Sequence, residues 1–228
     1  MSLRIKAFYA LTVLSIGLTL FGLYGTFYWT PLEVNEIGFT QKIFYFHVPM
    51  AITSGIAFAI TMVASILFLI TKNLKWDAWA VVGAELGLLF GTALLWMGII
   101  WQRSTWGVWW TWDPRLTSFL VVMLLYGAYF VLRSSVDTQM QKARFAASIG
   151  IVGYLAVMFT MLSTRILRSV HPVLFTLSDS GLGDSSMLVT FLVAMFAMFA
   201  LLGAILVLKV SYENTVEELD YLKGQIGG

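Results

Sequence analysis

Long apolar runs separated by short polar segments make up most of this 228-residue chain. A helix that crosses the hydrocarbon core of a bilayer needs about 20 mostly apolar residues, each rising about 1.5 Å. The runs here are non-alternating and longer than the strands of a membrane barrel. The pattern therefore predicts an all-α, polytopic membrane protein with six transmembrane helices. We expect these at residues 7–28, 43–70, 79–101, 116–132, 145–164 and 186–208.

Composition agrees with a membrane protein and argues against several other classes. Hydrophobic residues make up 59% of the chain and charged residues only 11%, whereas soluble domains carry about 25% charged residues. The net charge of +2 argues against a strongly basic nucleic-acid-binding protein. The absence of cysteine excludes disulfides, thiolate catalysis and cysteine zinc sites within this chain. No repeat or low-complexity linker divides residues 1–228, so we expect a single membrane domain.

The distribution of lysine and arginine predicts the orientation in the membrane. With six spans, nine of the 14 basic residues fall on the side of the two termini and five fall on the opposite side. The positive-inside rule then places both termini in the cytoplasm. The expected outer segments are 29–42, 102–115 and 165–185.

The C-terminal tail, residues 211–228, differs from the apolar runs. Its apolar residues recur at helical spacing with acidic residues between them. We expect a solvated cytoplasmic helix in preference to a helix that docks on a partner.

One carboxylate, Glu85, interrupts the third apolar run. Ionisable side chains within a membrane usually face protein or water. Two roles are open for Glu85: helix packing within the chain, or contact with a partner subunit.

The two histidines, His47 and His171, are both predicted on the outer side. Pro49 suits the first turn of a helix that carries His47, and Pro172 disfavours helical geometry at His171. Two unrelated interfacial histidines are one interpretation. The other is a ligand pair for haem iron, to which the porphyrin supplies four nitrogens. Zinc usually takes three or four protein ligands.

Tryptophans are concentrated in one outer segment: five of the nine lie within residues 101–112. Anchoring at the membrane interface accounts for one or two of them. Trp106, Trp109 and Trp110 have the spacing that would place their rings on one face of a short helix. Gly107 permits close approach to the backbone. We therefore predict an aromatic platform for a large, flat, apolar ligand such as a porphyrin.

Charged residues flank this tryptophan-rich segment. Asp113 is expected to cap a helix that starts near Pro114. Haem carries two propionates, and arginine pairs well with carboxylates, although a snorkelling interfacial arginine is the commoner role. The candidate propionate partners are Arg103, Arg115, Arg165 and Arg168.

Residues 106–117, WGVWWTWDPRLT, resemble the tryptophan-rich WWD signature of the haem-handling proteins of cytochrome c maturation. Six spans in a short chain, with FHVP at residues 46–49 opening the second span, resemble the haem exporter protein C (CcmC) family. This resemblance covers nearly the whole chain.

The resemblance implies a haem site on the outer face of the inner membrane, with haem b as a transient cargo. It implies that His47 and His171 are the axial ligands of the haem iron. It also implies delivery of haem to the chaperone CcmE and assembly with CcmA, CcmB and CcmD. With the arginines included, the expected haem-binding residues are His47, His171, Trp106, Trp109, Trp110, Trp112, Asp113, Arg115, Arg165 and Arg168.

Three function classes are compatible with a six-span chain of this kind. Haem handling fits an exposed outer site best, because the cargo must be held and then surrendered. A b-type electron-transfer cytochrome and a cofactor-free permease subunit are the alternatives. We expect no enzyme, because the sequence shows no nucleophile–base pair and no paired carboxylates for hydrolysis.

Overall fold

The computed structural model describes residues 3–32, 38–171, 182 and 184–226, and these ranges contain helices and connecting segments but no strand. Six helices are long and apolar enough to cross a membrane, which confirms the predicted all-α fold class. A π-helical turn, Gly25–Trp29, extends the first helix, and a 3-10 helix, Gly38–Ile43, leads into the second. The helices are α1 Leu3–Tyr24, α2 Phe44–Thr71, α3 Leu74–Trp106, α4 Pro114–Ser134, α5 Gln139–Ile166 and α6 Ser185–Ile226.

Local signals determine where several helices begin and end. Lys72 ends α2 in the left-handed conformation, with φ 57°. Asn73 then caps α3, because its side chain accepts a hydrogen bond from the backbone N–H of Lys75. Directly before α6, Asp184 accepts hydrogen bonds from the backbone and the hydroxyl of Ser186. These bonds lower the pKa of Asp184 below its ordinary value.

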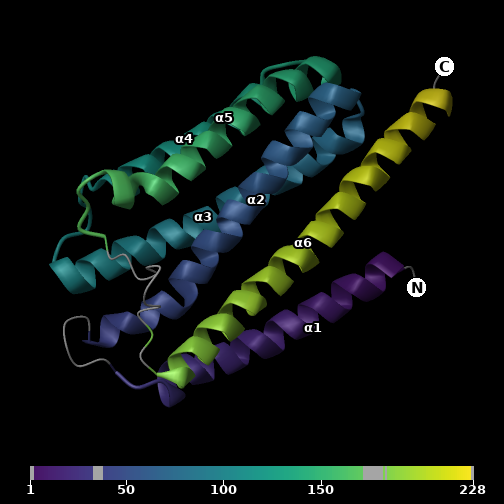
Figure 1. Ribbon diagram of the computed structural model, residues 1–228. Helices are drawn as coiled ribbons and strands as arrows, with labels where there is room; N and C mark the ends of the chain where they lie inside the picture. The colour runs from purple at the N-terminus through teal and green to yellow at the C-terminus, as the bar shows by residue number, and fades with distance from the viewer. Residues whose placement is uncertain (1–2, 33–37, 172–181, 183, 227–228) are drawn as a thin grey trace.

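The helices form three antiparallel pairs, with α2–α3 between α1–α6 and α4–α5 (Figure 1). The N-terminus, the C-terminus, the α2–α3 turn and the α4–α5 turn lie at one end of the bundle. The opposite end carries the start of α2, the α3–α4 loop and the end of α5, and we call it the histidine end. The two groups of connections therefore lie at opposite ends, as an even number of spans requires. Which end faces the cytoplasm is still a prediction.

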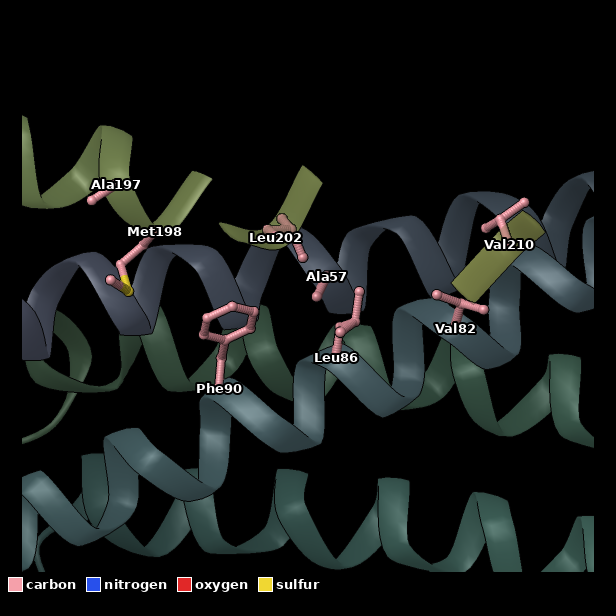
Figure 2. Close-up of a cluster of buried hydrophobic side chains, with 8 residues drawn as sticks. All are labelled: Ala57, Val82, Leu86, Phe90, Ala197, Met198, Leu202 and Val210. Atoms are coloured by element: carbon pink, nitrogen blue, oxygen red, sulfur yellow. The ribbon is translucent and has the colours of Figure 1, made fainter. Parts of the chain in front are cut away.

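Buried apolar side chains, from alanine to phenylalanine in size, fill the space between α2, α3 and α6 (Figure 2). In a bilayer, helix association depends on close packing and polar contacts more than on the hydrophobic effect. A Cβ on Gly83 would lie 2.9 Å from the carbonyl oxygen of Ala57, so glycine permits the close approach of α3 to α2. The residues drawn in Figure 2 are Ala57, Val82, Leu86, Phe90, Ala197, Met198, Leu202 and Val210.

Two ion pairs join α3 to other helices. Arg133 of α4 donates two hydrogen bonds, of 2.7 and 2.8 Å, to the two carboxylate oxygens of buried Asp77. Lys209 of α6 pairs with Glu85, so Glu85 has a packing role within the chain. Breaking a buried pair by removing one partner leaves an uncompensated charge. The Asp77–Arg133 pair therefore fixes α4 against α3 near the end that carries the termini.

The tail predicted at residues 211–228 is helical as far as Ile226 and continues α6 without a break. A helix of 42 residues measures about 63 Å, about twice the thickness of the hydrocarbon core. The C-terminal part of α6 therefore extends beyond the membrane. Its exposure to solvent is still a prediction.

Candidate functional site

His47 lies in the first turn of α2, at the histidine end of the bundle. Its ring packs against α3 at Gly98, where a Cβ would lie 3.3 Å from His47 Cε1. The ring nitrogen Nδ1 is buried and has no hydrogen-bond partner within the described ranges. Pro49, predicted in the first turn, is instead the sixth residue of α2, so that prediction was wrong. The 3-10 helix and the first residues of α2 make the chain helical well before Pro49.

His171 lies five residues beyond the end of α5, outside any helix. Its backbone N–H donates a 3.1 Å hydrogen bond to the hydroxyl of Ser169. The centroids of the His171 and Trp101 rings are 6.4 Å apart. His171 and Arg115 are both close enough to His47 to interact with it electrostatically. The structure therefore brings the two histidines together at one site. Pro172 lies outside the described residues.

The helix predicted for the tryptophan-rich segment is wrong. Helix α3 ends at Trp106, and Gly107 follows it in the left-handed conformation, with φ +74°. Residues 107–113, which we call the tryptophan loop, are not helical. The loop is thus shorter than the predicted segment 102–115, and Trp106 is not in one helical face with Trp109 and Trp110. The physical reason is Gly107, whose φ breaks the helix at little cost because glycine lacks a Cβ.

The tryptophan rings form edge-to-face pairs in place of one flat face. Trp101 and Trp106 have centroids 4.9 Å apart, and those of Trp110 and Trp112 are 5.9 Å apart. Trp109 is 62% exposed and Trp112 is 77% exposed. Such exposure leaves apolar aromatic surface open to a ligand or a partner.

Asp113 has the predicted capping role and a second role that sequence analysis missed. Its Oδ1 accepts a 3.0 Å hydrogen bond from the backbone N–H of Arg115, and Pro114 is the first residue of α4. Its Oδ2 accepts a 2.9 Å hydrogen bond from the backbone N–H of Val170. Asp113 therefore links the start of α4 to the segment that carries His171. The second bond joins residues 57 positions apart, so no local pattern predicted it.

The four candidate arginines occupy different places. Arg115 is partly buried and interacts with His47. Arg168 lines an open pocket of about 450 Å³ between the tryptophan loop and the segment after α5. Arg103 is already engaged, because it donates to the carbonyl of Gly107 and lies 5.5 Å from the ring centroid of Trp109. Arg165 is exposed in the last turn of α5. Arg115 and Arg168 are thus the arginines that the geometry places at the site.

Sequence analysis also missed Gln102, which is only 1% exposed. Its side-chain oxygen accepts two hydrogen bonds, both of 3.1 Å, from the backbone N–H and the hydroxyl of Thr111. These bonds hold the middle of the tryptophan loop against the last turns of α3. A single buried amide leaves no periodic signal, so sequence analysis had no ground for selecting this residue.

Comparison with known proteins agrees with this architecture. The family described as Heme exporter protein C matches residues 1–223. The Heme exporter protein C of Rhodobacter capsulatus is 35% identical over 144 residues, which cover 63% of this chain and 58% of that protein. That of Bradyrhizobium diazoefficiens is 32% identical over 161 residues, which cover 71% of this chain and 60% of that protein. The chain thus spans about three fifths of the length of these two relatives.

The relatives also include mitochondrial proteins. A putative cytochrome c biosynthesis ccmC-like mitochondrial protein of Arabidopsis thaliana is 36% identical over 108 residues, which cover 47% of this chain and 42% of that protein. Together with the six membrane-spanning helices, the match over residues 1–223 shows that the chain belongs to the Heme exporter protein C (CcmC) family.

Proposed function

We propose that this protein binds haem b at the histidine end of the bundle and presents it to the haem chaperone CcmE during the biogenesis of c-type cytochromes. The observation that carries the proposal is the position of His47 and His171 against the same stretch of α3, at Gly98 and Trp101, just before the tryptophan loop. The names of the relatives, heme exporter protein C and cytochrome c biosynthesis protein, support the same function.

The donor set fits haem. Two neutral imidazoles suit the two axial positions of an iron whose other four ligands are porphyrin nitrogens. Within the described ranges, no group of three or more His, Cys, Asp or Glu side chains is placed to hold a metal ion. The indole rings supply aromatic surface for the porphyrin plane. Arg115 and Arg168 supply cations for the propionates. Haem, as the cargo, brings the iron and the ring, and the protein supplies ligands, orientation and charge.

The exposure of the site suits transfer better than permanent storage. His47 Nδ1 is buried, but Trp109 and Trp112 expose most of their side chains. A haem that leaned on these rings would keep one edge open to an incoming chaperone. A b-type cytochrome usually seats its haem between helices, within the membrane. Here His47 lies at the start of α2 and His171 follows the end of α5, so both belong to one end of the bundle. The protein therefore acts in handling and transfer, with no catalytic step assigned to it.

The proposed setting is the bacterial inner membrane, with the haem site on the outer face and both termini in the cytoplasm. CcmA, CcmB and CcmD are the proposed partners in an ATP-driven complex that acts with CcmE. The lipid bilayer surrounds the helices, and no nucleic acid is involved.

Loading and transfer of haem test the proposal directly. The purified protein, loaded with ferric haem b, should show a six-coordinate low-spin spectrum. The haem-free soluble domain of CcmE should then take up this haem faster than an excess of apomyoglobin does. Apomyoglobin is the control, because it captures only haem that dissociates spontaneously from the protein. A low-spin spectrum with no faster transfer would favour the b-type cytochrome. The absence of any haem spectrum would favour the permease.

Labelling of introduced cysteines tests the orientation, and the chain has no cysteine of its own. Leu32 and Ser135 lie at opposite ends of the bundle, and both are exposed. A membrane-impermeant thiol reagent applied to intact cells should label Leu32→Cys and spare Ser135→Cys. After the cells are lysed, both variants should be labelled, which controls for reactivity. Labelling of Ser135→Cys alone in intact cells would reverse the orientation.

A further inference from the structure

The side-chain amide of Gln102 accepts hydrogen bonds at its oxygen, whereas its nitrogen has no hydrogen-bond partner among the described residues. Thr111 offers a backbone N–H, which can only donate, so the Gln102 atom that faces it must be the oxygen. This contact fixes the orientation of the amide and leaves Nε2 on the other side. Nε2 is buried and has no hydrogen-bond partner among the residues that the structure describes. Burial of a donor without an acceptor is unfavourable, so the site is incomplete without an acceptor.

The tryptophan loop contains a second buried hydrogen-bond donor. The indole Nε1 of Trp110 is buried and, within the described ranges, also lacks a hydrogen-bond partner. Trp110 directly precedes Thr111, the residue held by Gln102. Two buried N–H groups, one in the last turns of α3 and one in the tryptophan loop, thus lack an acceptor among the described residues. Neither group can accept a hydrogen bond, so a ligand that satisfies either of them must carry an acceptor atom such as oxygen.

The position of Gln102 connects this donor to both histidines. Gly98, one helical turn earlier on the same face of α3, packs against the ring of His47. Trp101, the residue before Gln102, lies beside the ring of His171. Residues 98–102 of α3 therefore contact both histidines and the tryptophan loop. A ligand held by the histidines would lie next to this turn.

Charge at the site favours an anionic acceptor. Arg115 places a cation near His47. The carboxylate oxygens of Asp113 already accept from the backbone N–H groups of Arg115 and Val170. Backbone N–H groups therefore occupy both oxygens of the Asp113 carboxylate. The guanidinium of Arg115 suits a further carboxylate, supplied by the ligand.

We propose that the Gln102 amide is a carboxylate-binding group of the haem site, with Nε2 donating a hydrogen bond to a propionate of bound haem. This inference rests on the proposed function. On haem the four ring nitrogens are taken by iron, so only the propionate oxygens are good acceptors. Gln102 then has two tasks: its oxygen positions the loop through Thr111, and its nitrogen orients the haem by one carboxylate.

Titration with two forms of haem tests the proposal in the purified full-length chain. The probes are ferric haem and its dimethyl ester, in which both carboxylates are uncharged. Wild-type protein should bind haem more tightly than the ester. Gln102→Glu retains an oxygen for Thr111 but replaces the donor by an acceptor. It should lower the affinity for haem about tenfold or more, since charge-assisted hydrogen bonds are the strong ones. Its affinity for the ester should stay within about twofold.

Two further variants keep the test decisive. Thr111→Val removes only the hydroxyl donor to Gln102 and should leave the ratio of the two affinities unchanged. Gln102→Met has a side chain of similar volume but no hydrogen-bond donor. It replaces Gln102→Glu if the glutamate variant fails to fold. It should also lower the preference for haem over the ester.

Equal affinity of wild-type protein for both probes would overturn the inference and leave haem binding intact. An equal loss for both probes in Gln102→Glu and Gln102→Met would also overturn it, because Gln102 would then act only on the loop. Failure of wild-type protein to bind either probe would overturn the proposed function itself.

Discussion

Replacing His47 or His171 by alanine is expected to lower the affinity for haem at least about tenfold, because even loss of a group that supports a metal ligand costs that much. Loss of one imidazole should also convert six-coordinate low-spin haem into a five-coordinate high-spin species. The position of both histidines against residues 98–101 of α3 is the physical basis of this expectation. Absorption and electron paramagnetic resonance spectra of the ferric protein, recorded with haem titrations, provide the measurement. An unchanged spectrum in both variants would remove the axial assignment.

Two glycines of the chain provide a graded control. A Cβ on Gly98 would lie 3.3 Å from His47 Cε1, so Gly98→Ala should shift the imidazole slightly and perturb the spectrum without loss of haem. A Cβ on Gly127 of α4 would meet nothing within 4 Å. Both substitutions place alanine within a helix, where it is favoured over glycine. Gly127→Ala should therefore leave the haem spectrum as it is in the wild type, and a change there would indicate a general effect on the bundle.

The membrane spans and the grouping of the histidines were predictable because their causes are local. A bilayer requires about 20 apolar residues for each helical crossing, and an even number of crossings returns the chain to its starting side. Residues 47 and 171 must then lie on one side, and the start of α2 and the end of α5 do lie at the same end of the bundle (Figure 1). The Asp113 cap was predictable for the same reason, since it joins Asp113 to a residue two positions later.

Contacts between distant parts of the chain were not predictable from the pattern. Asp77 and Arg133 are 56 positions apart, and Glu85 and Lys209 are 124 positions apart. Hydropathy cannot show which helix faces which, so neither pair could be assigned from the sequence. The position of Gly107 was visible in the sequence, but the tryptophan spacing favoured a short helix across it. The left-handed conformation of that one glycine decided the shape of the loop.

The junction at Asp113 lies between the tryptophan loop and the segment that carries His171, so its removal should affect the delivery of haem more than its retention. Asp113→Ala removes the cap of α4, worth about 1 kcal/mol, and the bond to Val170, where a charged acceptor is worth about 1.5–3 kcal/mol. Both histidines remain in this variant, so some haem should still bind. Transfer to CcmE should fall about tenfold or more, because each 1.4 kcal/mol that favours a displaced loop is a factor of ten.

The matched variant is Asp113→Asn, since asparagine is as good a helix cap as aspartate but has only one side-chain oxygen. This oxygen can accept the hydrogen bond from Arg115 or the one from Val170 but not both, so the transfer rate of Asp113→Asn should fall between those of the wild type and Asp113→Ala.

Trp110→Ala should behave like Asp113→Ala, because it removes a ring of the loop and leaves the iron ligands in place. Haem in the protein and haem on CcmE are measured in the same membranes. Normal delivery of haem by Asp113→Ala and Trp110→Ala would make the tryptophan loop an interfacial anchor without a part in transfer. Loss of bound haem in both variants would place the loop among the groups that hold the iron.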